Sequence, residues 1–303
     1  MLLRLILMIL LFPLKSINYI RRRFEKKIEF KDKFIISVGN LSFGGSGKTP
    51  LVIEIARFFE ELGIKTAVFL RGYKGEMENI GGKVKLSDKT IIWGDEAILI
   101  KRNINSPVFV GKNRIKQIKS IDNLKIKILI FDDGFQYFKI KKDLDIIIYD
   151  FKDPSPLARD FKSELKKADI IFNKSGQRIE KTEDYIIVFD GIYDCRDNKI
   201  NDYSGKEFTA FSGIGTPESF KKTLSENNIK YKQFITYPDH YFYKQKDIDK
   251  LVGYNSPLIT TEKDFVKLKE FNIRDLYYLK IRVKLKDKFK KELVKKFEEK
   301  NTL

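Results

Sequence analysis

The sequence has very few of the residues that form cross-links and metal clusters. Its 303 residues include one cysteine, Cys195, and one histidine, His240. A single cysteine excludes an internal disulfide and a cysteine-based metal site, and a reducing cytoplasm fits this composition. Zinc-ligand spacing, internal repeats and low-complexity tracts are absent, and no basic-aromatic pattern of RNA-binding modules stands out. We therefore expect no nucleic-acid partner.

Long apolar runs are also absent. Residues 1–14 are apolar except for Arg4, but a run of about 13 residues is shorter than the roughly 20 that cross a bilayer. The run lacks the small-residue cleavage site of a removed signal peptide. Basic residues 21–23 follow it. We expect an interfacial helix or a short anchor at the cytoplasmic face of a membrane, and a buried N-terminal helix is the alternative.

Acidic residues are outnumbered by basic ones. The chain has 60 Lys and Arg against 42 Asp and Glu, which gives a formal net charge of +18. This excess suggests an anionic partner such as phosphate, nucleic acid or an acidic membrane surface. Lys and Glu are interspersed along the chain, so a Lys/Glu-rich surface of the heat-adapted kind explains the charge equally well.

What the sequence does contain is a phosphate-binding loop. Residues 42–49 read Ser-Phe-Gly-Gly-Ser-Gly-Lys-Thr, between a buried strand at 34–38 and an amphipathic helix. Such a strand–turn–helix unit binds anions with backbone N–H groups and the helix dipole. Lys48 would reach the β- and γ-phosphates, and Thr49 would ligate Mg²⁺. The residues expected to form the cradle are Gly44, Gly45, Ser46 and Gly47.

Two pairs of acids accompany this loop. Asp132 and Asp133 follow an apolar strand at 126–131, which is the form of the Mg²⁺-orienting partner of a phosphate loop. Asp95 and Glu96 open a helix-like run. They either complement the helix dipole or place a carboxylate pair near the phosphates, and the residue pattern leaves both interpretations open.

Polar residues also follow other strands. Arg71 and Tyr73 come after a buried strand at 65–70, where open α/β sheets place ligands. Asn173 and Lys174 resemble the guanine-reading motif of GTPases, but Gly176 stands where that motif has an acid. The sequence therefore does not indicate specificity for GTP.

Strands alternate with helices through about residue 180, which predicts an α/β fold. We expect a doubly wound parallel sheet of the P-loop NTPase type and a second, smaller α/β domain. The predicted divisions are a membrane-associating segment at 1–26, a P-loop kinase core at 27–185, a linker at 186–206 and a C-terminal domain at 207–303.

Taken together, these motifs resemble those of the tetraacyldisaccharide 4'-kinase family of the Gram-negative lipid A pathway. The resemblance covers roughly residues 1–270, and its motifs lie at 39–50, 71–73, 94–96, 132–136, 211–215, 237–240 and 260–264. Four positions depart from the family pattern. Tyr137 stands where His is usual, and Ala97 stands where Pro is usual. Ala158 is an extra residue before Arg159, and Asp160 stands where Glu is usual.

The resemblance implies a kinase that uses ATP and Mg²⁺ to phosphorylate the 4'-hydroxyl of a tetraacylated glucosamine disaccharide 1-phosphate. It implies Asp95 as the base, supported by His240 from the second domain, with Lys48 and Asp133 as further catalytic residues. The implied metal site is Thr49, Asp132, Asp133 and Glu96. The residues expected to contact the acceptor are Arg71, Tyr73, Lys112, Arg114, Gln136 and Arg159.

The expected partners are therefore an anionic acylated disaccharide lipid and, through the N-terminal segment, a membrane surface. We expect a monomer on the cytoplasmic face of the inner membrane. The first alternative is a membrane-associated P-loop ATPase or GTPase that switches or chaperones a partner protein. The second is a membrane-surface binding module with a vestigial phosphate loop. The set of Lys48, Thr49 and Asp133 argues against the second.

Overall fold

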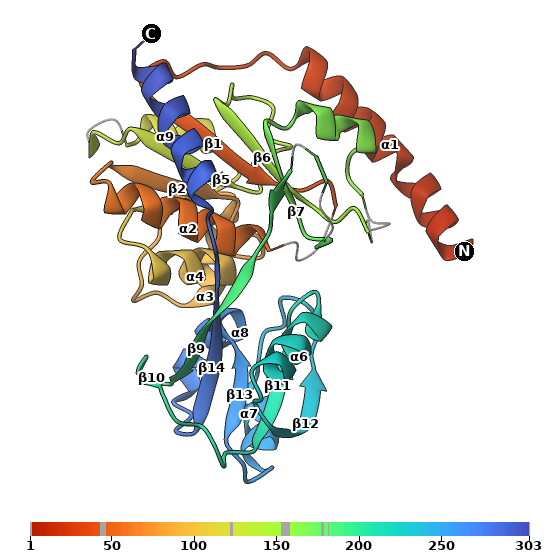
Figure 1. Cartoon of the computed structure of the whole chain (residues 1–303), viewed down its shortest axis with the longest axis vertical. Coiled ribbons are helices and arrows are strands. Elements are labelled where there is room, and N and C mark those ends of the chain that lie inside the picture. The colour runs from red at the N-terminus through yellow and green to blue at the C-terminus, as the bar shows by residue number, and fades with distance from the viewer. Residues whose placement is uncertain are drawn as a thin grey trace.

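A computed structural model of the chain describes residues 2–42, 47–121, 124–152, 158–176, 179–180 and 182–302, with side chains from Leu10 onward. These residues form two sheets, one above the other in Figure 1, and each sheet has helices packed on it. The predicted α/β class with parallel sheets is confirmed.

The first sheet has eight strands among the described residues, in the order β3-β4-β2-β5-β1-β6-β7-β8. Neighbouring strands run parallel, except that β3 is antiparallel to β4. Every residue of β1, β2 and β5 is buried, which is why these strands read as continuous apolar runs. The strands are β1 (Phe34–Gly39), β2 (Thr66–Leu70), β3 (Gly82–Lys83), β4 (Val108–Val110), β5 (Ile128–Asp132), β6 (Leu144–Tyr149), β7 (Ile170–Asn173) and β8 (Glu183–Asp184).

Helices connect these strands. The longest of them, α2 (Lys48–Glu61), follows β1 and buries Leu51, Val52, Ile55 and Phe59 against the sheet. These positions recur at helical spacing, so one stripe of the helix faces the core. The other elements of this half are α3 (Thr90–Trp93), α4 (Asp95–Asn103), α5 (Arg114–Lys119) and the 3₁₀ turns η1 (Glu76–Glu78) and η3 (Lys162–Lys167).

The second sheet has six strands among the described residues, in the order β10-β9-β14-β13-β11-β12. Its strands are β9 (Ile187–Asp194), β10 (Lys199–Ile200), β11 (Phe208–Ser212), β12 (Tyr231–Thr236), β13 (Leu258–Thr261) and β14 (Leu276–Val283). Its helical elements are α6 (Pro217–Glu226), α7 (Gln245–Val252), α8 (Glu262–Leu268) and η4 (Lys269–Phe271). Strands β9 and β14 are antiparallel and form the ribbon that runs between the two halves (Figure 1).

Two boundaries predicted from the sequence were wrong. The segment 186–206 is not a simple linker, because it contains β9 and β10 of the second sheet. The last helix, α9 (Asp287–Asn301), belongs with the first sheet, where Phe289 and Leu293 join its core. Its apolar stripe is visible in the sequence, but the stripe does not specify which of two sheets it covers.

Polar side chains join the two halves near the ribbon. Arg282 of β14 donates two hydrogen bonds to the Glu54 carboxylate of α2, at 2.8 and 2.6 Å. The Asn103 amide of α4 donates to Glu262 of α8 at 2.9 Å. These contacts bring α4 and α8 together, and the candidate site lies at their N-terminal ends.

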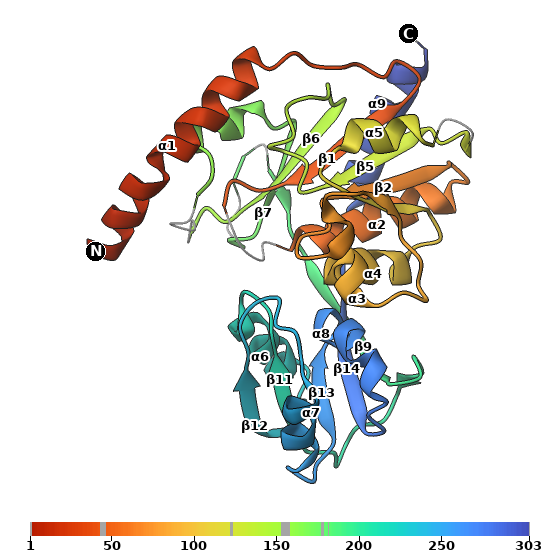
Figure 2. The ribbon, with the colours of Figure 1, turned by 180° about the vertical axis from the view of Figure 1, so that it is seen from behind.

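The N-terminal helix, α1 (Leu2–Phe24), lies on the outside of the first half and its first turns project away from the protein (Figures 1 and 2). Its apolar side chains Leu10, Ile17, Ile20 and Phe24 are 53 to 81% exposed. Their spacing places them on one side of the helix. Polar Asn18 is buried on the other side. The helix therefore turns its polar side inward and its apolar side outward. Among the described residues, no helix combines the length and apolar character needed to cross a bilayer.

Candidate active site

The phosphate loop ends at a glycine that the backbone requires. Gly47 precedes α2 and has a φ of 84°, in the left-handed region that favours glycine. A Cβ atom there would lie 2.5 Å from the Tyr185 hydroxyl, which donates to the Gly47 carbonyl at 2.6 Å. The other predicted cradle residues, Gly44, Gly45 and Ser46, lie outside the described residues.

The first residues of α2 meet the end of β5. Lys48 Nζ donates to Asn40 Oδ1 at 3.2 Å and lies 3.5 Å from Asp133 Oδ1. The Thr49 hydroxyl donates to Asp132 Oδ2 at 3.1 Å. Strands β1 and β5 are neighbours in the sheet, so their carboxyl ends deliver these groups to one edge. The structure thus brings together the predicted Lys48, Thr49, Asp132 and Asp133.

Asp132 is buried and electrostatically crowded. Burial and then the negative charge of Glu96 raise the pKa of Asp132 to about 7. Its Oδ1 atom has no hydrogen-bond partner among the described residues, although it is fully buried. A buried carboxylate oxygen without a donor is a suitable ligand for a hard cation. Asp132 and Thr49 therefore fit a Mg²⁺ site.

Asp133 has the opposite electrostatic environment. Burial alone would raise its pKa, but Lys48 and the hydrogen-bonded Arg159 hold the pKa of Asp133 well below its usual range. The Arg159 guanidinium donates to both Asp133 oxygens, at 2.7 and 2.9 Å. Asp133 also has a φ of 51°, which is uncommon for a residue other than glycine. Such backbone strain persists where the surroundings fix it, often at functional sites.

A second cluster joins the two halves of the protein. Asp95 is the first residue of α4, after Gly94 with a φ of 88°. His240, in the loop after β12, places Nδ1 2.9 Å from Asp95 Oδ2 and 3.1 Å from Oδ1. Burial would raise the pKa of Asp95, but Lys263 and the His240 hydrogen bond hold the pKa of Asp95 well below its ordinary value. Because the ionised Asp95 carboxylate can only accept, the His240 Nδ1–H group donates the hydrogen bond between them.

Lys263 is at the centre of this cluster. Its Nζ lies 3.4 Å from His240 Nε2, 3.5 Å from a Glu96 oxygen and 3.9 Å from Asp95 Oδ2. Burial would lower the pKa of Lys263, but the surrounding carboxylates of Glu96 and Asp95 raise it above its ordinary value. The ammonium is therefore charged, and it balances the two acids that begin α4.

The predicted acceptor residues are distributed unevenly. The Tyr73 ring contacts the His240 ring edge-on, with centroids 5.5 Å apart, so Tyr73 lies in the site. Arg71 donates to Glu78 at 2.6 Å, and Lys112 Nζ lies 3.4 Å from the same carboxylate. Both cations are largely exposed and remain at the edge of the site.

Three other predicted acceptor residues are held by the protein itself. Arg114 is buried against the Phe131 and Tyr137 rings, and its Nη2 donates to the Asp132 carbonyl at 2.6 Å. The Gln136 amide donates to the Asn40 carbonyl at 2.8 Å. Arg159 is engaged with Asp133, as described above. Arg114 was expected to contact the acceptor. Its buried position and its hydrogen bond to the Asp132 carbonyl indicate instead that it supports the turn after β5.

Sequence reasoning missed two polar residues of the site, Asn40 and Lys263. Asn40 follows β1 directly, and its side chain receives hydrogen bonds from both Lys48 and Arg159. Lys263 follows β13 within Thr260-Thr261-Glu262-Lys263-Asp264. Asn40 comes directly after a buried strand, and this position was the signal that would have identified it, whereas Lys263 is the second residue of α8 and its role depends on contact between the two halves.

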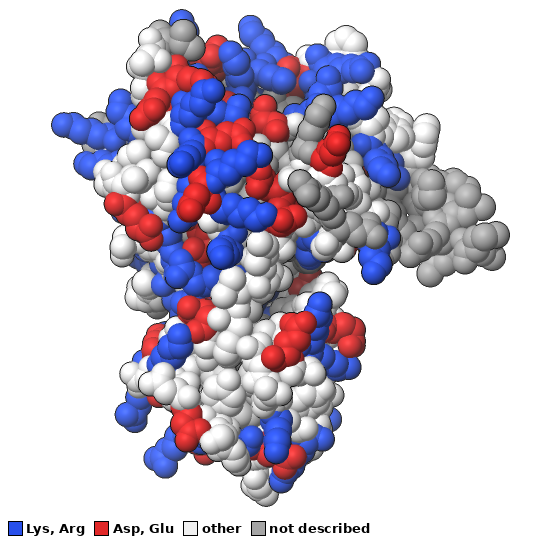
Figure 3. Space-filling view, in the orientation of Figure 1, with Lys and Arg blue, Asp and Glu red and all other residues white. Residues whose placement is uncertain are grey.

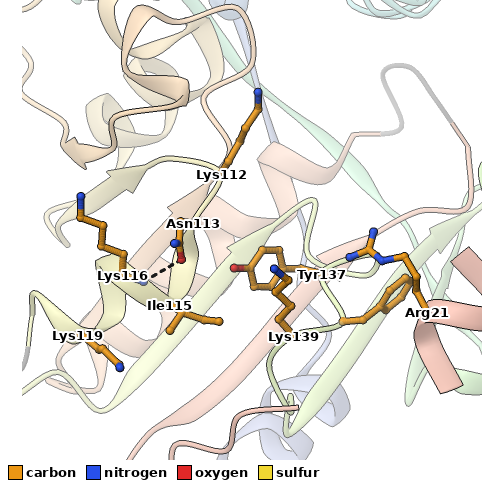
Figure 4. A pocket seen from close by; sticks show the side chains of 9 residues that line it. Arg21, Lys112, Asn113, Ile115, Lys116, Lys119, Tyr137 and Lys139 are labelled. Carbon is orange, nitrogen blue, oxygen red and sulfur yellow. Dashed lines mark hydrogen bonds between the residues drawn. The ribbon is translucent and has the colours of Figure 1, made fainter. Parts of the chain in front are cut away.

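A large basic cavity lies on the α5 side of the first sheet. Its volume is about 690 Å³, and no acidic residue is among those lining it. In Figure 4, Tyr137 lies at its centre, with Lys112 and Lys116 on one side and Arg21 of α1 on the other. The cavity contrasts with the face in Figure 3, where basic and acidic side chains are mixed. The other lining residues are Asn113, Ile115, Lys119, Phe138 and Lys139.

Comparison with known proteins identifies one family. The sequence profile described as tetraacyldisaccharide-1-P 4'-kinase matches residues 3–298. The chain is 35% identical over 266 residues to the tetraacyldisaccharide 4'-kinase of Legionella pneumophila strain Corby, which covers 84% of this chain and 81% of the relative. It is 31% identical over 303 residues to the enzyme of that name from Ruthia magnifica, covering 93% and 95% of the two chains.

A solved structure has the same architecture. LpxK from Aquifex aeolicus, solved in complex with ATP, superposes with a TM-score of 0.79 and 26% sequence identity. The match covers 97% of this chain and 99% of the other.

The ionised state of Asp95 predicts a pH-dependent contribution to stability. Its pKa is lower in the folded than in the unfolded chain, so the contribution is full above the unfolded pKa of about 3.9 and is lost as the pH falls through the folded value. The free energy of unfolding of Asp95→Asn should therefore fall well below wild type at pH 7, and the gap should narrow below about pH 4. Urea denaturation between pH 3 and pH 7 measures the difference in unfolding free energy and its change with pH. Exposed Asp249→Asn is the matched control, and a gap independent of pH would contradict the assignment.

Proposed function

The chain belongs to the tetraacyldisaccharide-1-P 4'-kinase family and is an ATP-dependent lipid A 4'-kinase, and we propose that Asp95, His240 and Lys48 carry its reaction. The γ-phosphoryl of ATP is transferred to the 4'-hydroxyl of a tetraacylated disaccharide 1-phosphate. The alternative of a P-loop ATPase or GTPase that switches a partner is not favoured, because the family match extends over residues 3–298. The observation that carries the assigned roles is the 2.9 Å contact between Asp95 and His240.

Asp95 is the base that accepts the proton of the attacking hydroxyl. It is ionised, and it lies on the first turn of α4 with His240 fixing its orientation. A carboxylate of low pKa is sufficient here, because phosphoryl transfer has a loose transition state and relies mainly on positioning. Lys263 keeps Asp95 in its charged form, and Tyr73 forms a wall beside His240.

Lys48 and Arg159 supply positive charge for the transferred phosphoryl. Lys48 Nζ contacts both Asn40 and Asp133. Arg159 shares the same two partners. Asp133 therefore acts as the anchor that holds both cations at the site. Charge held in place before the reaction is the main source of stabilisation in this chemistry.

Mg²⁺ would be held by Thr49 and Asp132, with Asp133 and Glu96 nearby. The unpaired Oδ1 of Asp132 and the 3.1 Å contact between Asp132 and the Thr49 hydroxyl support this assignment. Few protein ligands are needed, because Mg²⁺ usually keeps several waters and binds phosphate oxygens. When bound, the ion would neutralise charge on the β- and γ-phosphates.

The basic cavity takes the phosphate end of the acceptor. Its wall adjoins the catalytic edge of the sheet, because Arg114, next to lining residues Asn113 and Ile115, donates to the Asp132 carbonyl. A wall of Lys and Arg without acids suits a phosphate monoester. Lys112 lines this cavity directly, and Arg71 lies beside it through their shared partner Glu78.

The protein works as a monomer at the cytoplasmic face of the inner membrane, with α1 lying in the interface. The exposed apolar side of α1 and the exposed Arg21 and Arg23 at its end support this arrangement. Acyl chains leave a bilayer only at a cost of about 0.8 kcal/mol for each CH₂, so the enzyme must reach its acceptor at the surface.

Replacing the base should stop chemistry without stopping nucleotide binding. Asp95→Asn should lower kcat by about 10²- to 10⁴-fold, the usual contribution of a general base. His240→Ala should lower kcat less, because it removes orientation and not the proton acceptor. Transfer of label from ATP to the lipid and calorimetric titration with ATP measure the two effects, with Asp249→Asn as the control. Unchanged turnover in Asp95→Asn would remove Asp95 from the mechanism.

Charge reversal in the basic cavity should weaken binding of the acceptor selectively. In Lys116→Glu with Lys139→Glu, we expect the KM for the lipid to rise about tenfold, which corresponds to about 1.4 kcal/mol. The KM for ATP should not change, and added salt should reduce the difference. Lys222→Glu with Lys232→Glu, at two exposed positions of the second half, is the matched charge control. Equal effects of the cavity and control variants would show that only net charge matters.

The outward apolar side of α1 should determine membrane binding. Ile17→Ser with Ile20→Ser should reduce sedimentation with vesicles of acidic phospholipid, since each buried isoleucine contributes about 1.5–3 kcal/mol. The matched control is Ile80→Ser with Val252→Ser, which removes two exposed apolar side chains elsewhere. If both double variants sediment like wild type, another surface makes the lipid contact.

A further inference from the structure

The inner side of α1 is attached to the protein by polar contacts. The Asn18 side chain donates to the Arg159 carbonyl at 3.0 Å. Arg22 Nε lies 2.9 Å from a Glu164 oxygen, and its guanidinium lies over the Phe135 ring at 3.9 Å. Asn18 and Glu164 are buried, and the Arg22 side chain is 9% exposed. Solvent therefore does not compete for these contacts, and together they hold α1 against the protein.

The segment that α1 grips is the one that carries Arg159. The Arg159 N–H donates to the Leu41 carbonyl, at 2.6 Å, next to the phosphate loop. The Arg159 side chain donates to Asp133 and Asn40, and these two residues are the partners of Lys48. One residue thus has its backbone held by the membrane-facing helix and its side chain in the phosphate site.

A second connection runs in parallel with the first. Arg22 Nη2 lies 4.0 Å from Asp160 Oδ1, and the other Asp160 oxygen accepts from the Gln136 amide. Gln136 also donates to the Asn40 carbonyl at 2.8 Å. Both connections end at Asn40, and the first also reaches Asp133 through the Arg159 side chain. A displacement of α1 would therefore move the groups that hold Lys48.

We infer that Asn18 and Arg22 are positioning residues of phosphoryl transfer, Asn18 through Arg159 and Arg22 through Asp160 and Gln136. This inference rests on the proposed function. The helix that contacts the lipid surface also fixes Arg159 and Lys48. The apolar outer side of α1 would hold this part of the protein at the membrane, where the lipid acceptor is found. Neither residue touches the reacting atoms, so the expected effect is on kcat and not on the affinity for ATP.

The test uses the full-length enzyme with ATP and the tetraacylated disaccharide 1-phosphate in mixed micelles. Asn18→Ala and Arg22→Gln should each lower kcat by about 10- to 100-fold, the usual effect of removing a group that orients a site residue. The KM for ATP and sedimentation with vesicles should stay at wild-type values. Arg22→Lys keeps the ion pair with Glu164 and should recover most of the lost turnover.

A double-variant cycle tests whether the effect passes through Arg159. If it does, Asn18→Ala should cause no further loss of kcat in an Arg159→Ala background. Lys222→Gln is the matched control, because Lys222 is exposed on α6, away from the site, and its replacement removes the same charge. Its kcat should equal that of wild type.

The possible results separate this inference from the proposed function. An inactive wild-type enzyme overturns both. An active wild type with unchanged kcat in Asn18→Ala and Arg22→Gln overturns the inference alone, as does a loss that multiplies independently with Arg159→Ala. Thermal unfolding identifies a variant that does not fold. If Arg22→Gln is such a variant, Asn18→Ala and Arg22→Lys still decide between the outcomes.

Discussion

The contact between Asp95 and His240 is the constraint on which the site depends. It joins the first turn of α4 to the loop after β12, and the two residues are 145 positions apart in the sequence. Asp95 is buried, and leaving a buried charge unpaired is costly. The two halves of the protein must therefore meet at this point, with Lys263 between Asp95 and Glu96. The hydrogen bonds from Arg282 to Glu54 hold the same arrangement from the side of the β9–β14 ribbon.

Neighbouring carboxylates acquire separate roles from their surroundings. Asp132 and Asp133 are adjacent, yet burial and Glu96 raise the pKa of one, while Lys48 and Arg159 lower the pKa of the other against burial. Environments that push two pKa values apart assign different tasks to chemically identical groups. Asp132 keeps an unpaired oxygen suited to a cation, and Asp133 holds the side chains of Lys48 and Arg159. The left-handed backbone at Asp133 is what lets adjacent residues point into such different surroundings.

The sequence was sufficient for features that are local in the chain. Continuous apolar runs predicted β1 and β5, and an amphipathic run after Lys48 predicted α2. It was insufficient where the partner is distant. The buried position of Arg114 depends on rings supplied by Phe131 and Tyr137, and the sequence shows only an arginine after a strand. The position of α9 on the first sheet depends on a surface left open by other elements. Lys263 was missed because its role exists only when two sheets meet.

For the N-terminal helix α1, the proposed partner is a membrane surface and therefore lies outside the protein. The polar residues Asn18 and Arg22 would face water in an ordinary surface helix, and Ile17 and Ile20 would face the core. In this protein the two sides are exchanged, because polar side chains of α1 find buried partners in Arg159 and Glu164. A helix arranged in this way has its apolar side exposed, where it can contact lipid. In the proposed arrangement, the lipid surface, the helix and the cations Lys48 and Arg159 therefore form one continuous series of contacts.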